Sequence, residues 1–256
     1  MCIAPPPYGE RSKRLNQLID YVTARGWNSL FYNILFVAGF VALFIFNIFN
    51  SNNYKVPKAK ALVFVTLTYL ISTLWMFVMC WIENGFKGWG GNNIVRVFVW
   101  VPVVAWPLAK LFKLEWNRSC DLIAPCVPLI QAVSHWGCIF AGCCNGYPCS
   151  WGIISPVTQQ RLFPIQPIEA IVALAVAIIV WRYEKKKNFE PDGLAYPLML
   201  MLFGYSRVLL EFARDNEKIF LGMSSLALHA LFMALVGTAT YVTMKENIRK
   251  RRRVKC

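Results

Sequence analysis

Three charged side chains share one face of a segment that otherwise has the composition of a membrane span. Arg207, Glu211 and Arg214 follow one another at i, i+4 and i+7 in or just after the apolar stretch Leu194–Phe212, and this spacing places them on one helix stripe. A charge at mid-bilayer costs about 2.5–3.5 kcal/mol on insertion scales, so such residues are a functional-site hypothesis by default. Arginine suits a phosphodiester because its planar fork donates two hydrogen bonds and keeps its charge. We predict that Arg207 binds a phosphate, with Glu211 orienting it and Arg214 nearer to water; an ion pair that only fixes helix packing is the alternative.

A second candidate centre lies near the end of the apolar stretch Leu122–Ala141. His135 precedes a glycine-rich turn with Gly137 and Gly142, and we expect it at the same membrane depth as the arginine stripe. A histidine in this position could serve as acid or base, or contact a phosphate. The alternative is a core histidine with satisfied hydrogen bonds, which is the interpretation that we give His229.

Four cysteines crowd into the same region, namely Cys138, Cys143, Cys144 and Cys149. The chain contains no C-x-x-C pair, although structural zinc sites and thiol oxidoreductases usually use such short pairs. We therefore expect small-residue packing, with an outer-face disulfide such as Cys144–Cys149 as an alternative, and we predict neither a metal nor a cofactor.

The composition indicates an integral membrane protein. Of the 256 residues, 57% are hydrophobic and 15% aromatic, and the mean hydropathy is +0.45. A spanning helix needs about 20 mostly apolar residues. Seven stretches qualify and predict an all-α bundle of about seven transmembrane helices, namely Ser29–Asn50, Ala61–Ile82, Ile94–Phe112, Leu122–Ala141, Pro164–Trp181, Leu194–Phe212 and Phe220–Thr243. The first two carry no charge, and we expect them to be lipid-facing scaffold without a role in the chemistry.

The distribution of basic residues predicts an orientation. The net charge is +14, and lysine and arginine concentrate in alternate connections and in the tail from Lys245 onward. The positive-inside rule then favours an outer amino terminus and an inner carboxyl terminus. We divide the chain into a polar segment 1–28, a transmembrane domain 29–244 and a basic cytoplasmic tail 245–256, which we expect to meet anionic lipid rather than nucleic acid.

The order of these motifs resembles the prolipoprotein diacylglyceryl transferase family. The resemblance runs from about Gly85 to Met244 and rests on three blocks in the same order: DLIAPCVPLIQAVSHWGCIFAGCCNG, then PIQPIEA, then GYSRVLLEFARD. The family's R-x-x-x-E-x-x-R is matched by Arg207, Glu211 and Arg214, its Q-x-x-E by Gln166 and Glu169, its signature glycines by Gly137 and Gly142, and the acidic residue opening its fourth span by Asp121.

The chain also departs from the family pattern. His135 stands where the signature has arginine, and Cys138 where it often has asparagine. The H-G-G motif is reduced to Trp89 followed by Gly90 and Gly91. The tyrosine expected four residues before Arg207 is Phe203, whereas Tyr205 lies on another face.

The resemblance implies a seven-span enzyme of the bacterial inner membrane that acts in lipoprotein biosynthesis. It would transfer the diacylglyceryl group of phosphatidylglycerol to the lipobox cysteine in a prolipoprotein signal peptide. Arg207, Glu211 and His135 would be catalytic, and Arg214, Gly137, Gly142, Gln166, Glu169, Gly90 and Gly91 would contact substrate. Two other functions stay open: an altered or inactive phospholipid-binding paralogue, and a transporter that uses Arg207 and Glu211 as a gate.

Overall fold

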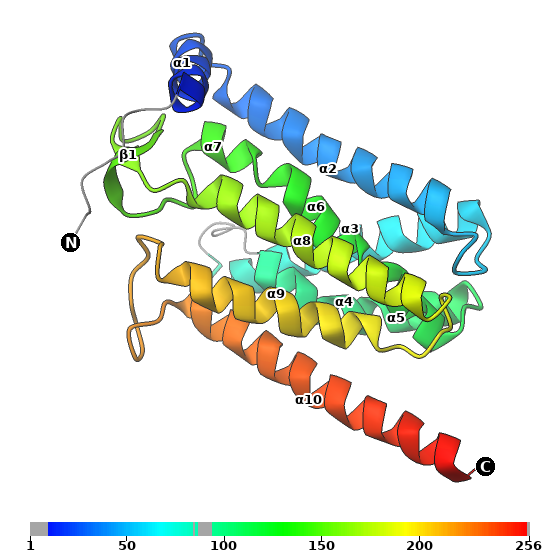
Figure 1. Cartoon of the computed structure of the whole chain (residues 1–256). Coiled ribbons are helices and arrows are strands. Elements are labelled where there is room, and N and C mark those ends of the chain that lie inside the picture. The colour runs from blue at the N-terminus through cyan, green and yellow to red at the C-terminus, as the bar shows by residue number, and fades with distance from the viewer. Residues whose placement is uncertain (1–9, 84, 87–93, 255–256) are drawn as a thin grey trace.

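The computed structural model describes residues 10–83, 85–86 and 94–254. These residues form a helical bundle whose long members run roughly side by side, with a small β-hairpin at one end (Figure 1). The expected Gly90 and Gly91 lie outside the described residues. Among the described helices, four are long and apolar enough to cross a membrane, namely Asn28–Asn50, Lys58–Ile82, Ile165–Lys186 and Ser225–Arg251. These helices confirm the prediction of an apolar, mainly helical membrane protein.

The next three helices after α1 (Glu10–Ala24) are α2 (Asn28–Asn50), α3 (Lys58–Glu83) and the shorter apolar helix α4 (Ile94–Leu111). They form over long apolar runs whose charged residues lie only near the helix ends, and α4 keeps two prolines inside it. Helix α3 packs against α4, and α2 lies along α6. Their inner faces contribute Leu43, Phe64 and Phe98 to the main core.

The fourth apolar stretch is broken into three short helices rather than one span. They are α5 (Trp116–Ile123), α6 (Cys126–Ser134) and α7 (Gly137–Ala141). Pro125 lies at the first break, where its ring cannot continue regular helix hydrogen bonding. Gly142 ends α7 in the left-handed conformation with φ of 64°. Because of these breaks, His135 and the cysteines Cys138, Cys143 and Cys144 lie close together at one end of the bundle. We call this region the cysteine corner.

The loop after α7 has structure of its own. Strands β1 (Pro148–Ile154) and β2 (Arg161–Leu162) pair antiparallel and add a small hairpin to the predicted all-α bundle. Helix α1 (Glu10–Ala24) covers the hairpin. The side-chain oxygen of Asn16 accepts a hydrogen bond from the Ile154 amide at 3.1 Å, and Val22 is buried in a small apolar cluster there. The polar first segment therefore includes a helix that packs on the bundle end.

Three long helices complete the bundle: α8 (Ile165–Lys186), α9 (Ala195–Glu211) and α10 (Ser225–Val254). Helices α9 and α10 pack through glycine. A Cβ on Gly204 would lie 2.7 Å from the Ala234 amide nitrogen, and one on Gly237 would lie 2.7 Å from that of Met201. Small residues allow such close backbone approach between membrane helices. Helix α10 continues without a break into the basic tail that we had separated at residue 245 (Figure 1).

Candidate functional site

The carboxylate of Glu169 is the centre of the polar site. It lies in the first turns of α8, and its side chain is buried among three basic groups. Arg214 contacts both oxygens, with Nε 2.7 Å from Oε1 and Nη2 2.6 Å from Oε2. Arg207 contacts Oε1 through Nη1, and Nε2 of His135 lies 2.6 Å from Oε2. The buried carboxylate is thereby compensated by two guanidinium groups, which together carry one positive charge more than it can balance.

Arg207, which we predicted to be oriented by Glu211, forms its ion pair with Glu169. Helix α8 lies beside α9, so the guanidinium of Arg207 reaches across to Glu169. Glu211 is buried and accepts hydrogen bonds from Asn216, at 2.8 Å, and from the Ser224 hydroxyl group. Arg207 and Glu211 lie on one face of α9, but the carboxylate of Glu169, on α8, contacts Arg207 and Arg214 at once. Glu211 instead fixes the connection between α9 and α10.

His135 lies between Glu169 and the thiols of the cysteine corner. It is the residue that follows α6, and its Nδ1 lies 2.8 Å from the Gln131 side-chain nitrogen and 3.6 Å from Cys138 Sγ. Gln131 is four residues earlier on the same helix face, a spacing that was visible in the sequence but that we did not use. His135 is buried, and Glu169 orients its ring from the other side.

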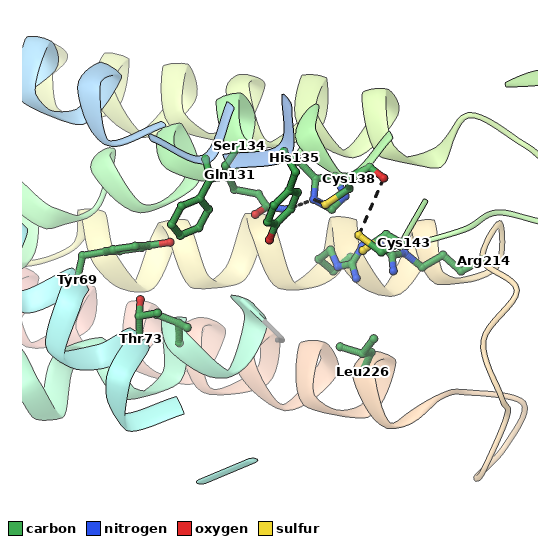
Figure 2. A pocket seen from close by; sticks show the side chains of 14 residues that line it. Tyr69, Thr73, Gln131, Ser134, His135, Cys138, Cys143, Arg214 and Leu226 are labelled. Carbon is green, nitrogen blue, oxygen red and sulfur yellow. Dashed lines mark hydrogen bonds between the residues drawn. The ribbon is translucent and has the colours of Figure 1, made fainter. Parts of the chain in front are cut away.

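A cavity of about 280 Å³ opens beside this cluster. Figure 2 shows Gln131, His135 and Cys138 along one wall, with Tyr69, Thr73 and Leu226 across from them. The lining residues are Tyr32, Phe36, Tyr69, Thr73, Val97, Gln131, Ser134, His135, Cys138, Cys143, Cys144, Arg207, Arg214 and Leu226. Both arginines of the stripe and the histidine thus line one cavity.

Helices α2 and α3 contribute directly to this cavity, contrary to our expectation of inert scaffold. Tyr32 comes from α2, and Tyr69 and Thr73 come from α3. Their polar groups interrupt apolar runs at positions that face inward. Hydroxyl-bearing residues in uncharged spans were the signal that we passed over.

The other predicted contact residues have mainly structural surroundings. Gln166 donates from Nε2 to the Cys143 carbonyl oxygen at 3.0 Å and so holds the loop after α7. A Cβ on Gly137 would lie 3.1 Å from the Tyr32 carbonyl oxygen, and one on Gly142 would lie 2.5 Å from a methyl carbon of Val157. Neither glycine lines the cavity. Their lack of a side chain serves the packing of the corner.

Two further predictions concern positions away from the cavity. Asp121 does not open a span: it lies inside α5, and its carboxylate accepts hydrogen bonds from the Gly193 and Ala195 amides at 3.0 and 3.1 Å. Phe203 is buried, whereas Tyr205 is 40% exposed. Phe203, which stands where the family has tyrosine, is therefore a packing residue and offers no hydroxyl group. Cys144 and Cys149 are both free thiols, so the alternative of a disulfide between them is wrong for this structure.

The fold and the site together define a membrane protein with a buried arginine–glutamate–histidine cluster at one end of a helical bundle. A family model described as prolipoprotein diacylglyceryl transferase matches residues 26–243. The chain belongs to this family.

Individual relatives carry the same description. The phosphatidylglycerol–prolipoprotein diacylglyceryl transferase of Cupriavidus metallidurans is 32% identical over 169 residues, which is 61% of each chain. That of Clostridium tetani is 27% identical over 164 residues, covering 60% of this chain and 62% of the relative. A protein of Clostridium perfringens named as the second such transferase is 26% identical over 181 residues, covering 67% of this chain and 69% of the relative. The chain spans about three fifths of the length of the first two relatives.

Proposed function

We propose that this protein transfers the diacylglyceryl group of phosphatidylglycerol to the thiol of a lipobox cysteine in prolipoprotein signal peptides. The observation that carries the proposal is the convergence of Arg207 and Arg214 on one cavity in an apolar bundle. The printed names of the relatives give the reaction and its two substrates.

Phosphate binding follows from the chemistry of the two arginines. A guanidinium group has five N–H donors in a fixed fork, and Glu169 engages Arg207 through a single nitrogen. Arg207 therefore keeps donors for the phosphate oxygens of a lipid, and Arg214 guides the headgroup toward it. As the glycerol carbon–oxygen bond breaks, charge accumulates on the departing phosphate, and fixed cations in a site of low dielectric stabilise it.

The acceptor thiol must lose its proton before it attacks the lipid, because the thiolate is the nucleophile. His135 faces the cavity and is oriented by Glu169, which is the arrangement of a general base. We assign catalytic roles to Arg207 and His135. Glu169 positions both of them, and Glu211 acts through the α9–α10 connection rather than on the substrate. Gln166 fixes the cavity loop.

We further propose seven membrane crossings, with α5 to α7 together as one broken crossing, in a bacterial inner membrane. The amino terminus would lie outside and the basic end of α10 inside. This placement brings the cavity to the outer half of the bilayer, where an exported signal peptide arrives. Labelling of introduced cysteines with a membrane-impermeant reagent tests it: a reactive cysteine at residue 158 and an unreactive one at residue 250 are expected in intact cells, and the reverse contradicts the orientation.

Complementation tests the reaction. A bacterial strain depleted of its own diacylglyceryl transferase should regain growth and mature lipoprotein with the wild-type gene and with Arg182→Ala, which alters an exposed arginine of α8. Arg207→Ala, expressed to the same level in the membrane, should not restore either. Absence of rescue by the wild-type protein would argue against the reaction.

A non-catalytic lipid-binding role is the second candidate, and the replacement of the family's signature arginine by His135 favours it. It predicts that phosphatidylglycerol co-purifies with the wild type and less with Arg207→Ala, while lipobox peptide stays unmodified. Mass spectrometry of the bound lipid and of the peptide separates the two functions.

A further inference from the structure

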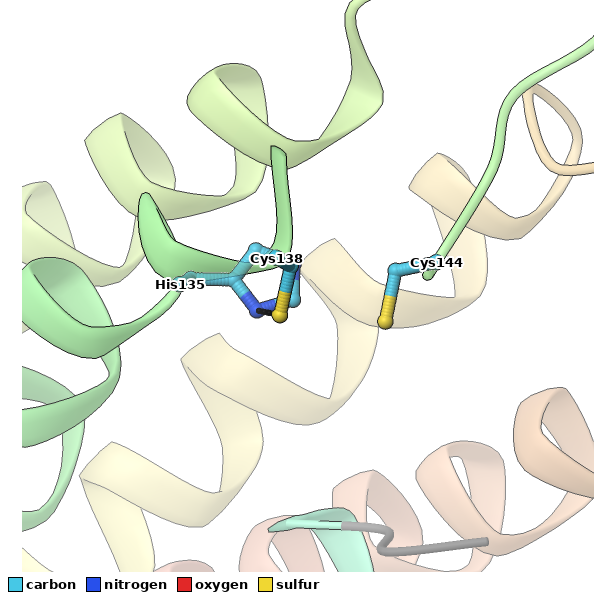
Figure 3. Close-up of side chains that lie close together, drawn as sticks. All are labelled: His135, Cys138 and Cys144. Carbon is cyan, nitrogen blue, oxygen red and sulfur yellow. Dashed lines mark hydrogen bonds between the residues drawn. The ribbon is translucent and has the colours of Figure 1, made fainter. Parts of the chain in front are cut away.

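Three groups that bind soft metal ions meet at the cysteine corner. One ring nitrogen of His135, Sγ of Cys138 and Sγ of Cys144 all lie within 4.8 Å of one another (Figure 3). Nδ1 of His135 and the Cys138 sulfur are 3.6 Å apart. In a tetrahedral zinc site with Zn–N of about 2.0 Å and Zn–S of about 2.3 Å, neighbouring ligand atoms are separated by about 3.5–3.8 Å. The nitrogen–sulfur spacing already matches that edge, and Cys144 sits on a loop beside it.

The hydrogen-bond partners of His135 favour the tautomer in which Nδ1 can bind a metal ion. Glu169 Oε2 lies 2.6 Å from Nε2, so the ring proton of the neutral imidazole belongs on Nε2, between nitrogen and carboxylate. The lone pair is then on Nδ1, which faces Cys138. A carboxylate behind the histidine is the usual outer shell of a metal-binding imidazole. The Gln131 side-chain nitrogen, 2.8 Å from Nδ1, occupies the lone pair in this structure, and a metal would displace that amide by a side-chain rotation.

We propose that His135, Cys138 and Cys144 bind one zinc ion. Two thiolates and one neutral imidazole balance the double charge of Zn²⁺, and this ligand set favours zinc over hard cations such as magnesium. Two cysteines and one histidine also form a known three-ligand catalytic zinc site, with the fourth position left to water or substrate. We did not expect a metal from the sequence because the spacing lacks C-x-x-C; the left-handed turn at Gly142 is what returns Cys144 to Cys138.

The fourth position would face the cavity that Arg207 and Arg214 line. Resting on the proposed function, we assign it to the acceptor thiol of the signal peptide. A coordinated thiol is deprotonated outright, so with zinc bound the metal, and not His135, whose Nδ1 lone pair it would occupy, would activate the acceptor thiol. In the transfer, the sulfur–carbon bond forms as the lipid carbon–oxygen bond breaks. The proton lost from the thiol ends on the glycerol phosphate that leaves.

Metal content tests the site without reference to activity. The full chain, purified in detergent with a non-thiol reductant and given Zn²⁺, should retain about one zinc per chain after desalting. Replacement of zinc by Co²⁺ should produce thiolate-to-cobalt charge-transfer absorption. Both signals should be lost in Cys144→Ser and in His135→Gln, and kept in Cys149→Ser, which removes a thiol from the same loop. Size-exclusion profiles and helical circular dichroism identify any variant that fails to fold.

Several outcomes would overturn the proposal. These are a reduced, folded wild type that retains no zinc, equal zinc in all variants, or a Cys138–Cys144 disulfide that persists under reductant. Cys143→Ser should keep the zinc, since a loss would mean four protein ligands and no open position. If zinc binds but lipobox peptide is never modified, the proposed function fails and the metal site stands. If chelated protein transfers diacylglycerol at the full rate, the assignment of the acceptor thiol fails.

Discussion

Arg214 and Glu169 form a bidentate ion pair, with nitrogen–oxygen distances of 2.7 and 2.6 Å. The pair joins the segment just after α9 to the start of α8. Both side chains are almost completely buried. The pair links Arg214, which lines the cavity, to helix α8, whose Glu169 also contacts His135. It also makes Glu169 the residue whose loss leaves most charge uncompensated.

We expect Glu169→Gln to destabilise the protein by about 3–5 kcal/mol, because it strands two buried guanidinium groups. Thermal unfolding in detergent should show a large fall in the midpoint. Glu217→Gln, which alters an exposed carboxylate of the following loop, should change the midpoint little. Equal midpoints for the two variants would contradict the central place of Glu169.

Gly237→Ala should weaken the packing of α9 on α10. A Cβ at residue 237 would lie 2.7 Å from the Met201 amide nitrogen and 2.9 Å from the Pro197 carbonyl oxygen, and backbone atoms cannot yield to it. Overpacking of this kind costs about 1–3 kcal/mol. Val236→Ala, at a neighbouring position that is 40% exposed, serves as the control in the same thermal assay. An unchanged midpoint for Gly237→Ala would show that the two helices are farther apart.

Lys187 holds three carboxylates together at the opposite end of the bundle. Its Nζ lies 2.7 Å from Glu184 Oε1 and 3.4 Å from Asp121 Oδ2, and it also contacts Asp192. We expect Lys187→Met to lower stability by about 3–5 kcal/mol, since it leaves buried carboxylates without a cation. Lys186→Met, at an exposed position next to it, should have little effect on the unfolding midpoint.

The same cluster predicts a pH dependence. Burial lowers the pKa of Lys187, but the charge of Asp121 and hydrogen bonds to Asp192 and Glu184 outweigh burial, so the pKa is raised above its usual 10.5. The folded state binds this proton more tightly than the unfolded state, so its stabilisation is complete below pH 10.5. It is lost as the pH rises through the higher folded-state value. The unfolding midpoint of the wild type should fall in this alkaline range, and that of Lys187→Met should lack this component.

Much of the site was predictable from residue types that are costly in a membrane. Arg207 and His135 were recognised as polar groups in or beside apolar stretches, Arg214 as the next residue of the same stripe and Glu169 through the family's Q-x-x-E, and the structure brings the four together. Their partners were not predictable, because the neighbour of Arg207 is set by the packing of α8 on α9 and not by spacing within α9. Distances along one helix cannot reveal that choice.

The broken fourth stretch shows the same limit. We predicted a single span over Leu122–Ala141, and the structure has three short helices there, with Pro125 at the first break. The return of Cys144 toward Cys138 could not be read from spacing, because it depends on the left-handed turn at Gly142 and on the hydrogen bond from Gln166 to the Cys143 carbonyl. The hairpin was missed because β2 is only two residues long.

The most direct test of the transferase account is product formation by the purified protein. Phosphatidylglycerol with labelled acyl chains and a lipobox peptide are incubated with the wild type, Arg182→Ala and Arg207→Ala in detergent, with zinc present. The account predicts a peptide heavier by one diacylglyceryl group, formed at similar rates by the first two proteins and about 100-fold or more slowly by Arg207→Ala, which lacks a cation on the leaving phosphate. A folded wild type that binds the lipid and leaves the peptide unmodified, or an Arg207→Ala variant as fast as the wild type, would contradict it.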